Sequence, residues 1–233
     1  MQTNEVQRSW ALLPLFLWLC ERSGAQTLDL IELGPSAGFN LVWDRYRYRY
    51  DGGQWGPAEA PLELAGTERR RVPEQLLRLT PTVRGRIGID LEPVDVTDPE
   101  NVLLLKSFVW AGQEERLERI DRAVEAVRQD PSRIVQGDYV ELLPEVLAER
   151  REGALTIVFQ TASMVYLSEE QRARVYAALE AASRETPVGW VSTTHAREGT
   201  NGSGLEARLL PGKAQLLAEM DFHGSWLEWL GAP

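Results

Sequence analysis

The hydrophobic and polar positions of this chain follow two different periods, and the changes between them mark the expected strands and helices. Residues 28–33 and 155–160 are short, nearly continuous apolar runs, which are typical of strands buried on both faces. Residues 114–128 instead carry apolar side chains three or four positions apart with charged residues between them, which predicts an amphipathic helix. The pattern therefore predicts a parallel sheet between helical layers.

The same two periods predict elements along most of the chain. We expect further helices at residues 3–22, 140–151 and 168–183, and further strands at residues 86–91, 133–138 and 188–192. Thr3 is the expected N-cap of the first helix. Residues 206–210 and 214–220 are expected to close the sheet as an antiparallel hairpin around Pro211-Gly212. The predicted fold class is an open, doubly wound, mostly parallel α/β sheet in one domain spanning residues 1–233.

Residues 43–50 alternate strictly, with tyrosines on one face of the expected strand and arginines on the other. Asp51-Gly52-Gly53 suits a turn, and residues 62–64 suit a return strand, so we predict an inserted hairpin at residues 45–65. Arginines interleaved with aromatic residues also occur in proteins that bind single-stranded nucleic acid. We favour the structural interpretation, because tyrosines readily form the packed face of a hairpin.

Composition narrows the classes of partner. A formal net charge of −10 argues against general affinity for nucleic acid or for an anionic membrane. The single cysteine, Cys20, cannot form an internal disulfide, which favours a reducing, cytoplasmic setting. The apolar run at residues 10–20 is too short to span a bilayer, and we interpret it as a buried helix rather than a signal peptide. A zinc site is poorly supported, because His195 and His223 stand far apart with no cysteine near them.

The most informative segment is Gly34-Pro35-Ser36-Ala37-Gly38, which follows the first strand and precedes an expected helix at residues 39–43. A strand that turns sharply into a helix offers backbone N–H groups and a helix dipole to a nucleotide-like ligand. The same letters spell the G-x-S-x-G nucleophile elbow of hydrolases, with Ser36 as nucleophile, Asp138 as the acid and a downstream histidine. The loop and strands that such hydrolases need upstream of the elbow are missing, so we favour the ligand cradle.

Acidic residues stand at the ends of three predicted strands, where open α/β sheets collect their ligands. With the loop, they resemble the motifs of class I S-adenosylmethionine-dependent methyltransferases, which have a Rossmann-like sheet. The resemblance implies S-adenosylmethionine as cofactor, with Gly34, Ser36 and Gly38 around its amino-acid tail, Glu32 orienting that tail, Asp90 on the ribose and Asp138 on the adenine.

The resemblance also implies a methyl acceptor, which we expect to be a small molecule, and the net charge of −10 argues against a nucleic-acid or membrane partner. The expected acceptor-binding residues are Asn4, Glu5, Asp44, Arg45, Tyr46, Gln160 and His195, the last as a general base. Methyl transfer mainly requires alignment of acceptor and sulfonium, so we assign no catalytic residue. A methyltransferase-like scaffold that binds without catalysis is the competing hypothesis.

A second resemblance covers nearly the whole chain. It is carried by Gly88-Ile89-Asp90-Leu91-Glu92-Pro93, by His223-Gly224-Ser225-Trp226 and by residues 32–41 and 44–48. These segments are similar to the bacterial family called domain of unknown function 2332, which implies the same fold and no particular reaction. Members of that family carry a further, mostly helical N-terminal region, so we expect this chain to be a short member or a truncated form.

Overall fold

The computed structural model of the protein describes residues 5–231. Its helices are α1 (Arg8–Ser23), α2 (Glu74–Leu77), α3 (Pro99–Ser107), α4 (Glu114–Gln129), α5 (Tyr139–Ala148) and α6 (Glu169–Ser183), with 3₁₀ turns η1 (Trp43–Arg45) and η2 (Ser163–Tyr166). The strands are β1 (Thr27–Leu33), β2 (Arg47–Tyr50), β3 (Gly53–Trp55), β4 (Glu63–Ala65), β5 (Thr67–Arg70), β6 (Thr82–Asp90), β7 (Arg133–Gln136), β8 (Leu155–Gln160), β9 (Val188–His195), β10 (Ser203–Leu210), β11 (Gln215–Met220) and β12 (Trp226–Trp229).

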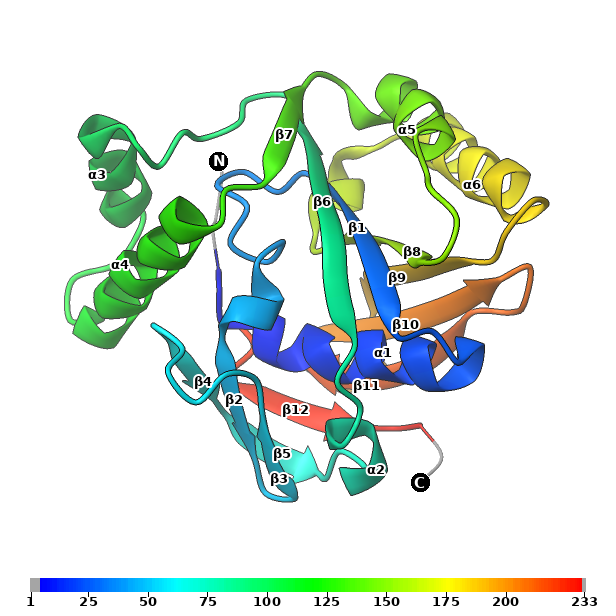
Figure 1. The fold of residues 1–233 in the computed structure, drawn as a ribbon. Helices are drawn as coiled ribbons and strands as arrows, with labels where there is room; N and C mark the ends of the chain where they lie inside the picture. The colour runs from blue at the N-terminus through cyan, green and yellow to red at the C-terminus, as the bar shows by residue number, and fades with distance from the viewer. Residues whose placement is uncertain (1–4, 232–233) are drawn as a thin grey trace.

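A nine-stranded sheet forms the centre of the molecule, in the order β5-β12-β11-β10-β9-β8-β1-β6-β7 (Figure 1). The strands β7, β6, β1, β8 and β9 are mutually parallel. Numbered along the chain, these five strands follow the order 3-2-1-4-5 of doubly wound folds, in which the order reverses between β1 and β8. The predicted fold class is confirmed, as is the C-terminal antiparallel hairpin formed by β10 and β11.

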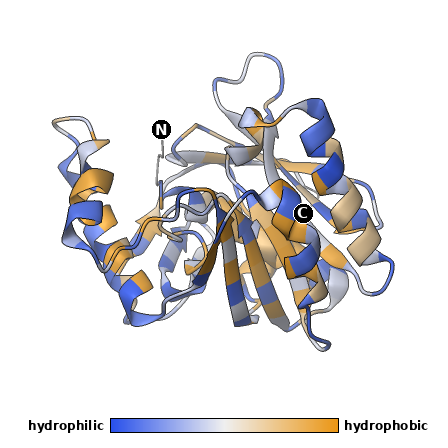
Figure 2. Ribbon diagram, turned by 90° about the horizontal axis from the view of Figure 1, so that it is seen from above, coloured by the Kyte–Doolittle hydropathy of each residue, from blue (hydrophilic) through white to orange (hydrophobic). Residues whose placement is uncertain are grey.

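Helices cover both faces of this sheet and enclose two hydrophobic cores. On one face, α1 packs against β8, β9 and β10, and its apolar residues join those of α4 in the larger core. On the other face, α5 and α6 pack against each other and cover a second core that includes Val158 and Trp190. The view from above shows helices with hydrophilic residues on their outer sides (Figure 2), whereas residues 9–20 of α1 are buried throughout. In the described part of the chain, no helix is both long and apolar enough to cross a membrane.

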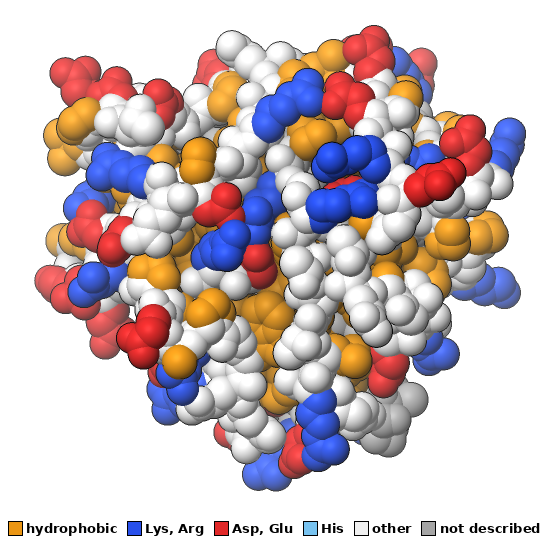
Figure 3. Space-filling model, in the orientation of Figure 1, with side chains coloured by type: hydrophobic (Ala, Val, Ile, Leu, Met, Phe, Trp, Pro, Cys, Tyr) orange, Lys and Arg blue, Asp and Glu red, His pale blue; other side chains and the backbone are white. Residues whose placement is uncertain are grey.

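A three-stranded sheet, in the order β3-β2-β4, forms the insertion after β1. The predicted hairpin is wrong in its pairing: β3 is the return strand, directly after the turn, and β4 joins the other edge of β2 in parallel. The tyrosines of β2 are buried in the larger core, while Arg47 and Arg49 form ion pairs with Glu63. On the face seen in Figure 3, acidic and basic side chains of the described residues are interspersed.

The helix predicted at residues 39–43 is absent, because the chain there forms turns that lead into η1. Phe39, Leu41 and Trp43 are all buried, and an irregular backbone lets neighbouring side chains enter the core in different directions.

The sequence patterns also missed β5, β12, α2 and α3. In β5, Thr67–Arg70 has no apolar side chain from which an alternating pattern could be recognised.

Candidate functional site

A cavity of about 600 Å³ opens at the carboxyl edge of the parallel strands. Its lining comes from the loops that follow β1, β6, β7 and β8, from Arg8 at the start of α1, and from residues of η2 and α6. These loops meet beside the reversal of strand order between β1 and β8, where doubly wound sheets bind ligands. The volume is in the usual range for a small-molecule site.

The structure brings four of the six predicted cofactor-binding residues to this cavity. They are Gly34, Ser36, Asp90 and Asp138. The other two, Glu32 and Gly38, are not among the described residues that line it. Three separate loops therefore contribute polar groups to one space, although they lie as far apart in the sequence as Gly34 and Asp138.

The backbone N–H groups of the loop after β1 are already engaged within the protein. Gly34 N donates to the carbonyl oxygen of Ile89 at 2.9 Å, and Gly38 N donates to that of Pro35 at 2.9 Å. Ser36 N donates to Oδ2 of Asp90 at 2.7 Å. The expectation that these three donors face a ligand is not met, and no α-helix follows the loop to add its dipole.

Asp90 and Asp138 both stabilise the backbone around the cavity. The Asp90 carboxylate accepts hydrogen bonds from Ser36 N and, at 2.9 Å, from Glu92 N, so it ties the loop after β1 to the loop after β6. Asp138 is the N-cap of α5, and its Oδ1 accepts a hydrogen bond from Val140 N at 2.8 Å. A carboxylate has about four acceptor positions. Both side chains thus retain capacity to accept hydrogen bonds from a ligand.

Backbone strain in the described residues is concentrated at this cavity. Ser36 and Ala162 are the two non-glycine residues there with positive φ, at 54° and 74°, and both line the cavity. Such conformations cost on the order of 1 kcal/mol or more and are common in ligand clamps. Gly34 also has a positive φ, and a Cβ atom at Gly34 would lie only 2.8 Å from Cβ of Ser163. The loops after β1 and β8 are therefore packed closely together.

Glu32 lies beneath the loop rather than in the cavity, with only 1% of its surface exposed. Its Oε1 accepts a hydrogen bond from Asn40 at 3.5 Å, and its Oε2 has no partner among the described residues. Burial raises the pKa of Glu32 to about 8, the negative charge of Asp90 adds to the shift, and Asn40 and Arg8 oppose it. A carboxyl with this pKa is mainly protonated at neutral pH.

The cavity is electrically polarised. Arg8 is the one basic side chain among the described residues that line it, while Asp90, Glu92 and Asp138 supply acidic groups. The acids lie at the carboxyl ends of β6 and β7. The Arg8 guanidinium instead donates to the carbonyl of Thr161, just after β8. Nothing in the sequence pattern singled out Arg8, because its position depends on where the start of α1 meets the sheet.

The expected acceptor-binding residues lie elsewhere. Asn4 is outside the described residues, and none of Glu5, Asp44, Arg45, Tyr46, Gln160 and His195 is among the residues that line the cavity. Gln160 is buried, and its side-chain oxygen accepts a hydrogen bond from Met164 N. His195 is exposed at the end of β9, and the described lining of the cavity includes no histidine.

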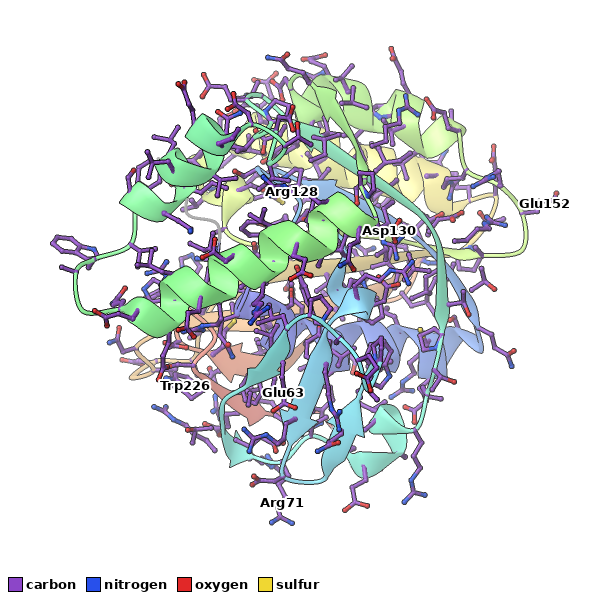
Figure 4. The ribbon with its side chains drawn as sticks, turned by 60° about the vertical axis from the view of Figure 1, so that its left-hand side comes forward. Glu63, Arg71, Arg128, Asp130, Glu152 and Trp226 are labelled. Atoms are coloured by element: carbon purple, nitrogen blue, oxygen red, sulfur yellow. The ribbon has the colours of Figure 1, made fainter. Side chains whose placement is uncertain are left out.

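Two of these candidates belong to an ion-pair network outside the cavity. Asp44 accepts from Arg86 at 2.6 Å, and Asp130 joins Arg86 to Arg45 at 3.0 and 2.6 Å. Asp130 lies directly after α4 (Figure 4), so the network connects that helix to β6 and η1. Tyr46 is fully buried and donates its hydroxyl hydrogen to the carbonyl of Phe39. Asp44, Arg45 and Tyr46 therefore each have a structural role outside the cavity.

The family model described as an uncharacterized protein conserved in bacteria, domain of unknown function 2332, matches residues 1–229. The chain belongs to this family. Comparison of this family member with curated proteins gave no match. A co-crystal structure of WbdD with a kinase inhibitor aligns with a TM-score of 0.35 and 14% identity, over 86% of this chain. The alignment spans only 32% of the WbdD chain, and a TM-score this low carries no argument about function.

Proposed function

We propose that the protein binds S-adenosylmethionine in the cavity at the carboxyl edge of its sheet and transfers the methyl group to a small-molecule acceptor. The observation that carries this proposal is the convergence of Gly34, Asp90 and Asp138, from three loops, beside the reversal of strand order. Ligands of doubly wound sheets bind at this place. The strained backbone of Ser36 and Ala162 in the same cavity further supports a ligand site.

The proposed cofactor matches the chemistry of the acidic side of the cavity. The Asp90 carboxylate has acceptor positions left for the ribose hydroxyls after its two backbone hydrogen bonds. Oδ2 of Asp138 is the proposed acceptor for the exocyclic amine of adenine, since Oδ1 caps α5. The side chain of Leu91, which also lines the cavity, is 65% exposed and offers an apolar surface to the base.

S-adenosylmethionine supplies an electrophilic methyl group when it is bound. The protein's contribution is to hold the sulfonium in line with the acceptor atom, and alignment of this kind accounts for much of the rate of group transfer. Tyr166 also lines the cavity and is largely exposed, so the acceptor is proposed to enter beside it. No residue of this chain is assigned as a base in this proposal.

The proposal is tested by thermal unfolding and calorimetry with S-adenosylmethionine. At 100 times its dissociation constant, a ligand of the folded state adds about 2.7 kcal/mol to the free energy of unfolding. We expect Asp138→Asn to weaken binding, because the amide loses the negative charge and half of the acceptor capacity while still capping α5. Asp98→Asn is the matched control, since Asp98 caps α3 in the same way outside the cavity. An unchanged melting temperature at millimolar ligand would refute the proposal.

A serine hydrolase is the second candidate, favoured by the positive φ of Ser36 within the G-x-S-x-G sequence. Such a hydrolase needs a histidine beside the serine, and no histidine is among the described residues that line the cavity, which argues against this function. A fluorophosphonate probe distinguishes the two functions, because it labels an activated serine. Labelling of the wild type that disappears in Ser36→Ala would establish the hydrolase. We expect no labelling of the wild type.

Binding of S-adenosylmethionine without transfer to any acceptor would indicate a binding module.

A further inference from the structure

The anionic end of the proposed ligand needs a partner that the loop after β1 does not supply. The amino-acid tail of S-adenosylmethionine carries a carboxylate, which sites of this kind bind with backbone N–H groups or with a cation. The N–H groups of Gly34, Ser36 and Gly38 are engaged within the protein, and no α-helix begins after the loop. A side-chain cation in the cavity is the alternative.

Arg8 has the geometry for this contact. Its Nε donates to the carbonyl of Phe222 at 3.0 Å, and its Nη1 donates to the carbonyl of Thr161 at 3.4 Å. A guanidinium has five N–H donors, so three remain after these two bonds, including both on Nη2. The two carbonyls fix the guanidinium at the wall of the cavity without neutralising its charge.

No described carboxylate forms an ion pair with Arg8, although the residue lines a cavity and is half-buried. Two other arginines with little exposed surface are paired: Arg86 with Asp44 at 2.6 Å and Arg116 with Glu5 at 2.9 Å. Burial lowers the pKa of Arg8 and the charge of Arg116 adds to this shift. The acids Glu5, Asp221 and Glu32 oppose it without forming an ion pair with Arg8. A ligand carboxylate would form an ion pair with this partly desolvated guanidinium and offset the cost of its burial.

We propose that Arg8 binds the carboxylate of the cofactor's amino-acid tail and thereby fixes the direction in which the cofactor lies. The tail then points toward the loop after β8, and the nucleoside points toward Asp90 and Asp138, after β6 and β7. This inference rests on the proposed function and replaces the loop N–H groups with a side chain from α1. It makes the first turn of α1 part of the binding site.

The experiment compares the dissociation constants of two ligands for the wild-type protein and three variants, measured by isothermal titration calorimetry on the full chain. S-adenosylmethionine and its decarboxylated form differ only in the carboxylate. Arg8→Gln removes the charge but leaves an amide that can donate to the carbonyl of Phe222. Arg8→Lys keeps the charge without the planar fork. Arg174→Gln is the control, because Arg174 pairs with Glu141 on the surface, outside the cavity.

We expect Arg8→Gln to raise the dissociation constant of S-adenosylmethionine roughly 10- to 100-fold. This is the loss of affinity expected when a charge-assisted hydrogen bond is removed. Arg8→Lys should lose less, and the decarboxylated ligand should bind the wild-type protein and all variants within about twofold. Equal weakening of both ligands in Arg8→Gln, or weakening of neither, would overturn the role of Arg8 and leave the proposed function standing. If neither ligand binds the wild-type protein, the proposed function itself fails, and the inference fails with it.

Discussion

Glu32 and Asp90 end neighbouring strands, yet their carboxyl groups are in different environments. Asp90 is 8% exposed and accepts two backbone hydrogen bonds, whereas Glu32 is 1% exposed and has an oxygen without a described partner. Hydrogen bonds from N–H groups stabilise the charged form of a carboxyl, and burial without them destabilises it. The sequence predicted both residues from their position at strand ends. It could not predict this difference, because the hydrogen-bond partners come from other loops.

Glu32→Gln tests the energetic consequence of that burial. The pKa of Glu32 rises from 4.5 to about 8 on folding, so between these pH values the folded protein holds a proton that the unfolded chain has lost. Stability therefore falls as pH rises from 4.5 to 8, by on the order of 1 kcal/mol per pH unit for this group. We expect the difference between Glu32→Gln and wild type to be constant below pH 4.5 and to shift in favour of the variant up to pH 8.

Urea unfolding at pH values from 4 to 8.5 gives the required free energies. Glu21→Gln, at an exposed position near the end of α1, controls for the loss of a carboxylate as such. A difference between Glu32→Gln and wild type that stays constant across this range would show that Glu32 is ionised in the folded protein.

Among the elements, the loops after β1 and β8 are held together by close packing as well as by hydrogen bonds. Oγ of Ser163 donates to the carbonyl of Leu33 at 2.8 Å. The only side chain that fits opposite Ser163 is the hydrogen of Gly34, whose φ of +76° also disfavours other residues. The spacing of these loops, and thus the shape of the cavity, depends on this contact.

Gly34→Ala separates backbone strain from steric contact when it is compared with Gly24→Ala. Gly24 has a similar φ of +72° and no atom within 4 Å of a Cβ placed there, so Gly24→Ala adds only the strain of a left-handed backbone, on the order of 1 kcal/mol. Gly34→Ala adds a 2.8 Å contact with Cβ of Ser163, and we expect it to cost at least about 1 kcal/mol more. Denaturant unfolding of both variants measures the two losses; equal values would mean that the loops move apart freely.

The elements that the sequence predicted well are those whose burial leaves a pattern. β8 was predicted at its observed bounds because all six residues of Leu155–Gln160 are buried between two helical layers. β5 was missed because an edge strand of polar residues resembles a loop until its partner, β12, is known. The contribution of Arg8 was missed for a related reason. A polar residue in an apolar helix says nothing about which neighbouring loop it will reach.

At the scale of the whole molecule, contacts between distant segments hold the layers in place. β5 pairs with β12, so Thr67 lies beside Trp226. Glu5, just before α1, is 3% exposed and pairs with Arg116 of α4 at 2.9 Å and with His223 at 3.4 Å. Glu5 was predicted to bind the acceptor, but it lies where α1, α4 and the loop before β12 meet.

Replacing either member of the Glu5–Arg116 pair leaves the other without the ion-pair partner at 2.9 Å. We expect Glu5→Gln and Arg116→Met each to lower the free energy of unfolding by about 3–5 kcal/mol at pH 7. The double variant should lose clearly less than the sum, because it removes both charges of the pair together. Additive losses in denaturant unfolding would show that the two side chains do not stabilise each other.

The same pair gives a pH dependence opposite in sign to that of Glu32. Burial alone would raise the pKa of Glu5, but the hydrogen bond with His223 and the charges of Arg116 and Arg119 outweigh it, so the pKa is lowered. A lowered pKa adds stability above the unfolded value of 4.5, and this stability is lost as pH falls through the folded value. The cost of Glu5→Gln should therefore shrink on acidification from pH 7 toward pH 3, since Glu5 of the wild type becomes protonated as well. A cost that does not change with pH would mean that Glu5 stabilises the layers by packing and not by its charge.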